Sequence, residues 1–281
     1  MTQQYHIAFF GTPELCIPIL DALHDSKFRP ELLITAPSKE SGRGMKMRDS
    51  AVKVWGRQHT TSVREVADSH ALVLLQETKW DFFVVVAFGM ILPKWVLDLP
   101  RYGALNVHYS LLPRYRGASP VETALLHGDS ETGTTIILMD EKMDHGRILG
   151  QEKIMLDKNN LPTTHSLQIK LSQLSAPLLI HIMDTYIQGT QTSHAQDESH
   201  TTYTKKITKA DGEVSESEFG SHALYRKFKA YTPRPGLYFF AERNDVRTRV
   251  KITDVAPDGT IRRVIPENMK EVDFDAWSLR T

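Results

Sequence analysis

Residues 81–88, which read DFFVVVAF, constrain the fold more than any other part of the sequence. Every position after Asp81 is apolar, so neither face of an extended strand here would be polar. Such a strand is typical of the centre of a parallel sheet that helices cover on both faces. This segment therefore predicts an α/β protein with a buried parallel strand.

The segments on either side alternate between strand and helix patterns. Residues 6–10 form a short apolar run that ends at a glycine turn, and apolar side chains then recur with a helical period to Leu23. Strand, turn and helix in this order open a βαβ unit. We expect Thr12 to cap this helix, and Pro18 either to delay the start of its regular part or to kink it. Further strands are predicted at 32–36, 105–107 and 134–139, with a short helical piece at 95–99. The first 150 residues therefore predict a doubly wound, Rossmann-like α/β domain.

A long helix is predicted at 164–188, and Pro177 is expected to introduce a kink in it. The composition of the sequence changes after this helix. Residues 189–204 are almost wholly polar and small, which is typical of a linker. Beyond residue 209, short strand-like pieces are separated by turns such as Pro257-Asp-Gly259. We predict a catalytic domain at 1–189, a linker at 190–208 and a small β domain at 209–281.

Composition excludes several classes of protein. Lys plus Arg number 34, as do Asp plus Glu, so the net charge points to no particular partner. The single cysteine, Cys16, rules out an internal disulfide and a cysteine cluster for zinc, and we expect no metal. The N-terminus lacks the pattern of a signal peptide, and no apolar run approaches the roughly 20 residues of a membrane helix. We expect a cytoplasmic protein without a membrane span.

Three polar side chains stand where predicted strands end. Asn106 and His108 lie two residues apart at the end of a strand, so they share one face of it, and Asp144 follows the strand at 134–139. Ligands of open α/β sheets bind at the carboxyl ends of the strands. A carboxylate near the histidine would fix its tautomer, and the asparagine amide would donate to an oxygen that gains charge when a carbonyl is attacked. This set predicts a carbonyl-centred group transfer.

Each residue alone also has a structural explanation. Asn or His at the end of a strand is commonly a cap or a turn residue, and Asp144 before Gly146 is commonly a turn aspartate. Arg114 and Arg116 would ordinarily belong to a solvated loop. Pro120 suits the first position of a helix that Ser119 would cap. The functional interpretation depends on the combination of residue types and on the sequence between them.

The combination resembles a known family. Asn106-x-His108, the loop Ser110-Leu-Leu-Pro-Arg-Tyr-Arg-Gly117 and Asp144 are similar to the signature of 10-formyltetrahydrofolate-dependent formyltransferases. The resemblance is closest to members that act on methionyl-tRNA, and it covers nearly the whole chain. It extends to Phe10-Gly-Thr-Pro-Glu14, the basic loop at 42–46 with 51–53, residues 87–93, 139–144, the 196–207 linker and Thr232-Pro-Arg-Pro-Gly236.

The resemblance implies a mechanism. The α-amine of methionyl initiator tRNA would attack the formyl carbon, Asn106 and protonated His108 would stabilise the oxyanion, and Asp144 would orient His108 and help to remove the amine proton. 10-Formyltetrahydrofolate would be the co-substrate. It would lie against one wall made by Phe88, Gly89, Ile91 and Leu92 and an opposite wall made by Ser110, Leu111, Leu112 and Pro113.

Two segments are locally basic. Five basic residues lie between Lys39 and Lys53, and eight between Tyr225 and Lys251. Such patches suit a phosphate backbone, although a basic patch is often only a solvated face. The resemblance implies that Arg43, Lys46 and Arg48 bind tRNA. We expect the protein to be a monomer.

The sequence departs from the family pattern in its C-terminal domain, where the middle strands of the expected β-barrel are missing. We therefore predict a shortened, OB-like barrel, which leaves its share of tRNA binding open. Two alternatives remain. One is a sugar-amine N-formyltransferase acting on a nucleotide-linked aminosugar, and the other is a catalytically inactive RNA- or folate-binding protein. The basic loop and the linker argue against the first, and the complete Asn106, His108 and Asp144 set argues against the second.

Overall fold

The computed structural model describes residues 4–41, 46–243 and 246–278, and the chain divides into two compact units. The first unit comprises residues 1–116, 133–153 and 169–202. The second comprises residues 117–132, 154–168 and 203–281. Residues 209–281 thus all belong to the second unit, which also takes in two earlier segments of the chain.

A seven-stranded sheet forms the centre of the first unit, in the order β10-β9-β7-β6-β1-β2-β5. β5, β2, β1, β6 and β7 pair in parallel, and β9 runs antiparallel to β7. The predicted α/β fold is confirmed. The strands are β1 Ile7–Gly11, β2 Leu32–Thr35, β5 Ser62–Glu65, β6 Phe82–Val86, β7 Ala104–His108, β9 Glu131–Leu138 and β10 Arg147–Met155.

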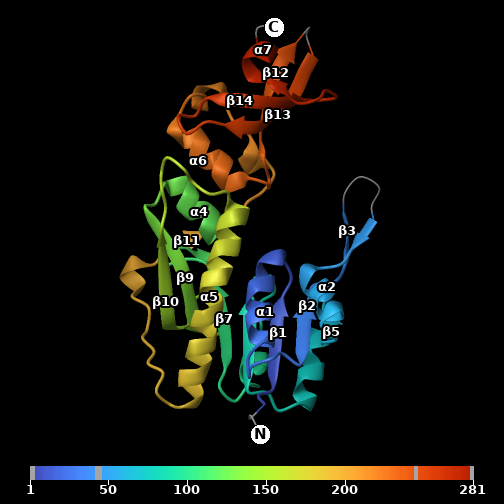
Figure 1. The fold of residues 1–281 in the computed structure, drawn as a ribbon, viewed down its shortest axis with the longest axis vertical. Helices are drawn as coiled ribbons and strands as arrows, with labels where there is room; N and C mark the ends of the chain where they lie inside the picture. The colour runs from blue at the N-terminus through green and yellow to red at the C-terminus, as the bar shows by residue number, and fades with distance from the viewer. Residues whose placement is uncertain (1–3, 42–45, 244–245, 279–281) are drawn as a thin grey trace. The chain divides into compact units, whose positions relative to one another are not determined.

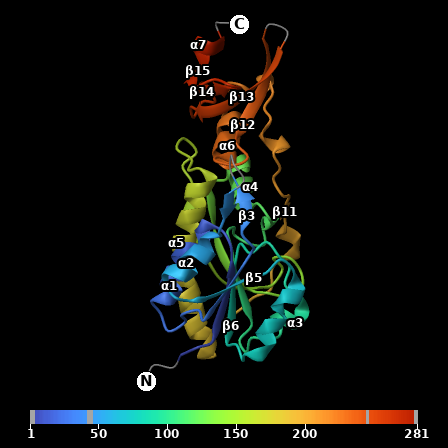
Figure 2. The same ribbon diagram turned by 90° about the vertical axis from the view of Figure 1, so that its right-hand side faces the viewer.

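Helices cover both faces of this sheet (Figures 1 and 2). α1 Ile17–His24, α2 Ala51–Gln58 and the part of α5 Thr164–Ile187 that belongs to this unit lie on one face. α3 Lys94–Leu97 and the 3-10 segment η2 Ser69–Glu77 lie on the other. All five residues of β6 are buried, as the apolar run predicts, because both of its faces pack against helices.

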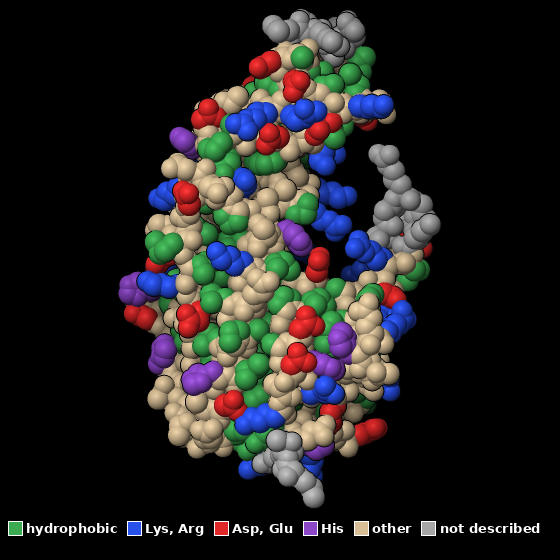
Figure 3. Space-filling view, in the orientation of Figure 1, with side chains coloured by type: hydrophobic (Ala, Val, Ile, Leu, Met, Phe, Trp, Pro, Cys, Tyr) green, Lys and Arg blue, Asp and Glu red, His purple; other side chains and the backbone are tan. Residues whose placement is uncertain are grey.

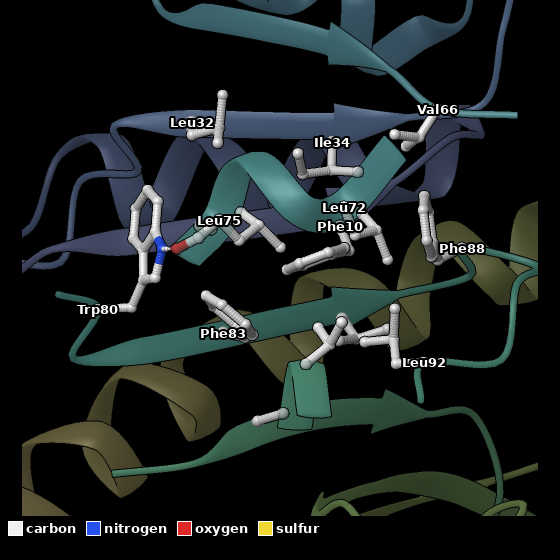
Figure 4. Close-up of a cluster of buried hydrophobic side chains, with 14 residues drawn as sticks. Phe10, Leu32, Ile34, Val66, Leu72, Leu75, Trp80, Phe83, Phe88 and Leu92 are labelled. Carbon is white, nitrogen blue, oxygen red and sulfur yellow. Dashed lines mark hydrogen bonds between the residues drawn. The ribbon is translucent and has the colours of Figure 1, made fainter. Parts of the chain in front are cut away.

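The face beneath η2 and α3 carries a large apolar cluster (Figure 4). The rings of Phe10 and Phe83 pack in its middle, tilted by 60° to one another, with ring centroids 5.1 Å apart. Trp80 closes one end, where its indole N–H donates to the carbonyl oxygen of Leu75 at 2.8 Å. Each fully buried large side chain of this kind stabilises the fold by about 1.5–3 kcal/mol. The cluster fixes the strand ends that carry the polar residues described below.

The order of the strands defines a switch point. From β1 the chain proceeds through β2 to β5, and it then returns to build β6 and β7 on the other side of β1. In doubly wound sheets ligands bind at the carboxyl ends of the strands beside such a point. A ligand site is therefore expected at this edge of the sheet.

The first helix begins later than the glycine turn. A short 3-10 segment, η1 Glu14–Cys16, precedes α1, and Pro18 lies in the first turn of α1. The N-cap is Cys16, whereas the Thr12 hydroxyl accepts a hydrogen bond from the N–H of Ala36 at 3.3 Å. The predicted cap at Thr12 is wrong, because this side chain joins two strand ends instead. The expected delay at Pro18 is confirmed.

The second unit contains a four-stranded antiparallel sheet in the order β12-β13-β14-β15. Each strand pairs with the next along the chain. The small, separate β unit is confirmed, and it is built as a meander. Its elements are α4 Pro120–His127, α6 His222–Tyr231, β12 Leu237–Arg243, β13 Val246–Val255, β14 Ile261–Pro266, β15 Val272–Asp273 and α7 Phe274–Ser278.

Aromatic side chains hold one face of this small sheet. Phe239 packs edge to face against Phe219 and Trp277, with centroids 5.2 and 5.9 Å away. Gly259 turns the chain between β13 and β14 with φ +90°, and a Cβ there would lie 2.1 Å from the carbonyl oxygen of Ser221. Only glycine fits this turn, because both the backbone conformation and the close approach exclude a side chain.

Shorter elements complete the chain. They are β3 Lys39–Ser41, β4 Lys46–Arg48, β8 Arg116–Gly117, β11 Tyr203–Thr204 and the 3-10 segments η3 Glu198–His200, η4 Ala210–Gly212 and η5 Glu216–Glu218. α4 begins at Pro120 as predicted, although the Ser119 side chain accepts no capping hydrogen bond. Among the described residues, none of the helices is both long and apolar enough to cross a membrane.

Candidate active site

The three predicted polar side chains come together at the carboxyl end of β7. The amide nitrogen of Asn106 lies 3.4 Å from Oδ1 of Asp144, and Nδ1 of His108 lies 3.6 Å from the same oxygen. The His108 side chain is 6% exposed and that of Asp144 14%. In this poorly solvated setting, charges and dipoles act more strongly than they do in water. The site thus joins an amide donor, an imidazole and a carboxylate within contact distance.

The imidazole of His108 is held from its other nitrogen. Nε2 lies 2.9 Å from the main-chain carbonyl oxygen of Tyr115. A carbonyl oxygen only accepts, so Nε2 carries a proton and donates it. Nδ1 is therefore the nitrogen that can gain or lose a proton, and it faces Asp144 and the site.

Three residues around the site hold left-handed backbone conformations although they are not glycine. Ala87 follows β6 with φ 45°, Tyr115 has φ 65° and Asp144 has φ 52°. Such a conformation costs a non-glycine residue roughly 1–2 kcal/mol. Strain of this kind persists where the surrounding structure fixes it, and it is concentrated at functional sites. At Tyr115 and Asp144 this conformation sets the direction of the groups that meet His108, which are the Tyr115 carbonyl and the Asp144 carboxylate.

Gly146 brings the Asp144 loop, residues 140–146, against the end of β9. A Cβ at this position would lie 1.9 Å from the carbonyl oxygen of Leu138. Any side chain would therefore push the loop off the strand. Asp140 braces the loop from within, since its carboxylate accepts from the N–H of Lys142 at 3.0 Å and contacts the His145 ring.

Arg116 lies inside the protein. It is 1% exposed, and its guanidinium donates to the Gln196 side-chain oxygen and forms two hydrogen bonds with the Glu198 carboxylate. Glu198 is held ionised, because the hydrogen bond from Arg116 keeps the pKa of this carboxyl below its usual range. The expectation of a solvated loop holds for Arg114, which is exposed, and is wrong for Arg116.

The segment after β6 contains both buried and exposed positions. Phe88 and Leu92 are buried and belong to the apolar cluster of Figure 4. Ile91, in contrast, is 79% exposed, and nothing lies within 4 Å of a Cβ built on Gly89. The inward residues fix the segment, while Gly89 and Ile91 leave an open apolar surface that a flat ring could cover.

The loop at 110–113 is tied to β9 through Thr135 and to β10 through Gln151, whose side-chain amide donates to the carbonyl of Leu112 at 2.9 Å. The Ser110 hydroxyl donates to the carbonyl of Arg114 at 2.7 Å, and the N–H of Leu112 donates to the Thr135 hydroxyl at 3.1 Å. Ser110 and Leu112 are buried, whereas Leu111 and Pro113 are partly exposed. Ser110 and Leu112 therefore shape the loop from within, and Leu111 and Pro113 supply its accessible surface.

The basic segment near residue 46 is an antiparallel hairpin of β3 and β4. Arg43 and the side chain of Lys46 fall outside the described residues, and Arg48 is exposed. Lys53 is 15% exposed and forms ion pairs with Asp49 at 2.8 Å and Glu65 at 2.9 Å. The charge of Lys53 is therefore paired with carboxylates of the protein itself, at the base of the hairpin.

The second basic segment places arginines on aromatic rings of the small sheet. The Arg249 guanidinium lies 3.8 Å from the centroid of Tyr238, and that of Arg247 lies 4.0 Å from Phe240. Arg226 and Lys227 of α6 instead bind carbonyl or carboxylate oxygens of their own unit. Over β13 and β14, the face in Figure 3 mixes Lys and Arg with Asp and Glu side chains.

Cys16 has no features of a nucleophile. It is fully buried, and its thiol donates to the carbonyl of Val86 at 3.3 Å. Burial raises the pKa of Cys16 to about 12, so the thiolate does not form near neutral pH. In the described part of the chain, no group of three His, Cys, Asp or Glu side chains is placed to hold a metal ion.

Comparison with known proteins agrees with this geometry. The family model described as formyl transferase matches residues 5–182. A methionyl-tRNA formyltransferase of Syntrophomonas wolfei is 34% identical and covers 98% of this chain and 87% of its own length. One from Legionella pneumophila is 36% identical and covers 89% of this chain and 80% of its own. The chain therefore belongs to the formyl transferase family and, within it, to the methionyl-tRNA formyltransferases.

Solved structures share the fold at lower identity. An N-formyltransferase from Helicobacter canadensis, in complex with folinic acid and dTDP-3-aminofucose, has a TM-score of 0.64 at 18% identity and covers 89% of this chain and 88% of its own. HypX from Aquifex aeolicus, in complex with tetrahydrofolic acid, has a TM-score of 0.66 at 13% identity, covering 98% of this chain and 47% of its own. At these identities the likeness concerns the fold alone.

Proposed function

We propose that this enzyme transfers the formyl group of 10-formyltetrahydrofolate to the α-amine of methionyl initiator tRNA. The observation that carries the proposal is the convergence of Asn106, His108 and Asp144 within 3.6 Å at the end of β7. The relationship to methionyl-tRNA formyltransferases along nearly the whole chain supports this acceptor over an aminosugar.

The arrangement suits attack of an amine on a formyl carbon. A bond forms between the amine nitrogen and the formyl carbon, and the bond from that carbon to N10 of the folate breaks. The amine passes a proton to Asp144, the carboxylate among the three side chains, and this proton then reaches N10 as tetrahydrofolate leaves, so that the overall reaction moves one proton from the amine to N10. Asn106 and the protonated Nδ1 of His108 donate to the oxyanion between these two events. One such donor lowers the barrier by about 2.7–4 kcal/mol in comparable acyl chemistry.

The proposed folate site lies between the segment after β6 and the loop at 110–113. Gly89 lets the main chain approach a flat ring closely, and Ile91 offers apolar surface that burial against the pterin would remove from water. The two walls are held in place by buried side chains, which are those of Phe88, Leu92, Ser110 and Leu112. Leu111 and Pro113 face the ligand from the second wall.

The proposed tRNA contacts are Arg43, Lys46 and Arg48, the basic residues of the sequence that runs from β3 to β4. Lys53 supports the hairpin of β3 and β4 through its ion pairs with Asp49 and Glu65. The arginines over Tyr238 and Phe240 offer a second surface of the kind that single-stranded nucleic acid binds. We place the catalytic domain at residues 1–189, the linker at 190–208 and the C-terminal domain at 209–281, and we propose a cytoplasmic monomer.

An acceptor assay tests the proposal. The enzyme is incubated with 10-formyltetrahydrofolate and either methionyl initiator tRNA or a dTDP-linked aminosugar, and formylated product is quantified. We expect transfer to the tRNA at least a hundred times faster than transfer to the sugar. If the formyl group is transferred to the sugar alone, the proposed active site stands and the proposed acceptor is wrong. If it is transferred to neither acceptor although the folate binds, the proposed function is overturned.

A further inference from the structure

We infer that Gln196 is a positioning residue, which holds the Asp144 loop in the conformation that aims the Asp144 carboxylate at Asn106 and His108. This inference rests on the proposed function for its catalytic consequence. The contacts that carry it all lie within the first compact unit.

Gln196 uses both ends of its side-chain amide. Its nitrogen donates to the main-chain carbonyl of Asp144 at 2.7 Å and to that of Gly146 at 2.9 Å. Its oxygen accepts from Nε of Arg116 at 3.0 Å and from Nη2 at 2.8 Å. Carbonyl groups only accept and a guanidinium only donates, so these partners fix the orientation of the amide.

The two carbonyl groups flank residue 145, so one amide sets the direction of the main chain on both sides of it. Asp144 has φ 52°, a conformation that few non-glycine residues hold without support. The carbonyl that Gln196 binds belongs to this same residue. A rotation of the Asp144 backbone would break this hydrogen bond and move the carboxylate away from His108.

Arg116 holds Gln196 in place. Its guanidinium is buried and pairs with Glu198 through two hydrogen bonds, of 2.7 and 3.2 Å, so its orientation is fixed. Bidentate pairs of this kind define geometry as well as energy. The N–H of Arg116 also donates to the carbonyl of Thr202 at 2.9 Å. The 196–202 segment thereby forms a brace from β8 to the Asp144 loop.

Two variants separate loop positioning from anchoring of the segment. Gln196→Ala removes all four hydrogen bonds of the side chain. Gln196→Glu keeps the acceptor that Arg116 binds, and as a carboxylate it loses both donors to the loop. Gln191→Ala is the matched control, because the Gln191 amide likewise binds a main-chain carbonyl of this unit, that of Leu149 at 2.8 Å, without contact to the Asp144 loop.

The kinetic experiment measures kcat and KM for both substrates, together with the thermal midpoint. A displacement of about 1 Å in a reacting group lowers rates on the order of 100-fold. We therefore expect kcat to fall about 10- to 100-fold in both Gln196 variants, KM to stay within about twofold, and Gln191→Ala to match the wild type. We also expect Gln196→Glu to lower the thermal midpoint less than Gln196→Ala does, because it keeps the two hydrogen bonds from Arg116. A Gln196→Glu enzyme as active as the wild type would overturn the inference, because anchoring to Arg116 would then suffice.

Hydrogen exchange gives a test that needs no substrate. We expect faster exchange at residues 140–146 in Gln196→Glu, unchanged exchange at 197–202, and no change at either segment in Gln191→Ala. Equal protection of the loop in Gln196→Glu and the wild type would overturn the inference. If the wild type fails to formylate methionyl-tRNA, the proposed function fails, and the exchange data still decide whether Gln196 positions the loop.

Discussion

His108 and Tyr115 are joined by a hydrogen bond of 2.9 Å, from imidazole Nε2 to the main-chain carbonyl oxygen. Tyr115 itself is fixed, because its N–H donates to the Thr202 hydroxyl at 2.8 Å and its φ is 65°. The bond assigns the two nitrogens of His108 to different tasks. Nε2 orients the ring, and Nδ1 is left for chemistry beside Asp144.

Two substitutions of His108 test this division. A glutamine amide reaches about as far as Nε2 and an asparagine amide about as far as Nδ1. We expect His108→Gln to keep the bond to Tyr115 and most of the stability, with kcat lowered about 10²- to 10⁴-fold. We expect His108→Asn to keep more activity and to lose about 1 kcal/mol of unfolding free energy. Denaturant titration and single-turnover transfer provide the two measurements, and the reverse ranking in either would contradict the assignment.

Asp144→Asn tests the role of the carboxylate. The change keeps the size of the side chain and removes its charge and most of its capacity to accept a proton. We expect kcat to fall about 10²- to 10⁴-fold while the Kd for the folate stays within about twofold. Asp98→Asn, at an exposed position whose carboxylate pairs with Lys94, is the control. Turnover that persists in Asp144→Asn would remove Asp144 from the reaction.

Ile91 and Leu92 separate binding from stability at adjacent positions. Ile91 is 79% exposed and Leu92 is 3% exposed, so their substitutions should act on different quantities. We expect Ile91→Ser to raise the KM for the folate severalfold with little change in the thermal midpoint. We expect Leu92→Ala to cost about 2–5 kcal/mol of unfolding free energy. A folate KM that is unchanged in Ile91→Ser would place the pterin elsewhere.

Much of the fold could be predicted because it depends on local apolar patterns. The run at 82–86 is buried on both faces as a central strand, and the pattern at 164–188 became a single long helix. The actual role of Thr12 could not be predicted in this way, and the expected cap was wrong. The Thr12 hydroxyl binds the N–H of Ala36, at the end of a neighbouring strand, and sequence spacing does not reveal that partner.

The same distinction, between local patterns and long-range contacts, applies to the site. The sequence could place Asn106 and His108 on one face, because strand alternation is a local property. It could not show that Arg116 is buried, since the partners Gln196 and Glu198 lie some 80 positions further on. Gln196 stood in the sequence only as part of a polar linker. The second arginine of the signature loop and a Gln-x-Glu pair in the linker were the available signals, and only the tertiary fold shows that they pair.

Lys53 gives a prediction on pH. Hydrogen bonds from Lys53 and Ser38 lower the pKa of Asp49 to about 2, from an ordinary value of 3.8. Because the folded-state value lies below the unfolded one, the pair stabilises fully above about pH 4, and this contribution is lost as the pH falls toward 2. We expect Lys53→Met to lower the thermal midpoint at pH 7, and we expect its gap to the wild type to narrow below pH 4. Lys94→Met, which removes an exposed pair, should show a smaller gap at pH 7, and a Lys53→Met gap that does not change with pH would contradict the account.

The hairpin and the small sheet offer competing surfaces for tRNA, and one comparison separates them. Each arginine that neutralises a phosphate contributes about one unit to the slope of log affinity against log salt. We expect Arg43→Ala to weaken initiator tRNA binding more than Arg249→Ala does and to reduce that slope by about 1. Arg249 lies against the ring of Tyr238, so its loss should affect packing on the small sheet as well as charge. The measurement is filter binding at several salt concentrations, with Arg101→Ala as a control. Arg101 is exposed, lies against the ring of Tyr102 and precedes β7 at the amino ends of the parallel strands, whereas the hairpin follows the carboxyl end of β2. A larger loss in Arg249→Ala would move the main tRNA contact to the C-terminal domain and leave the hairpin a secondary role.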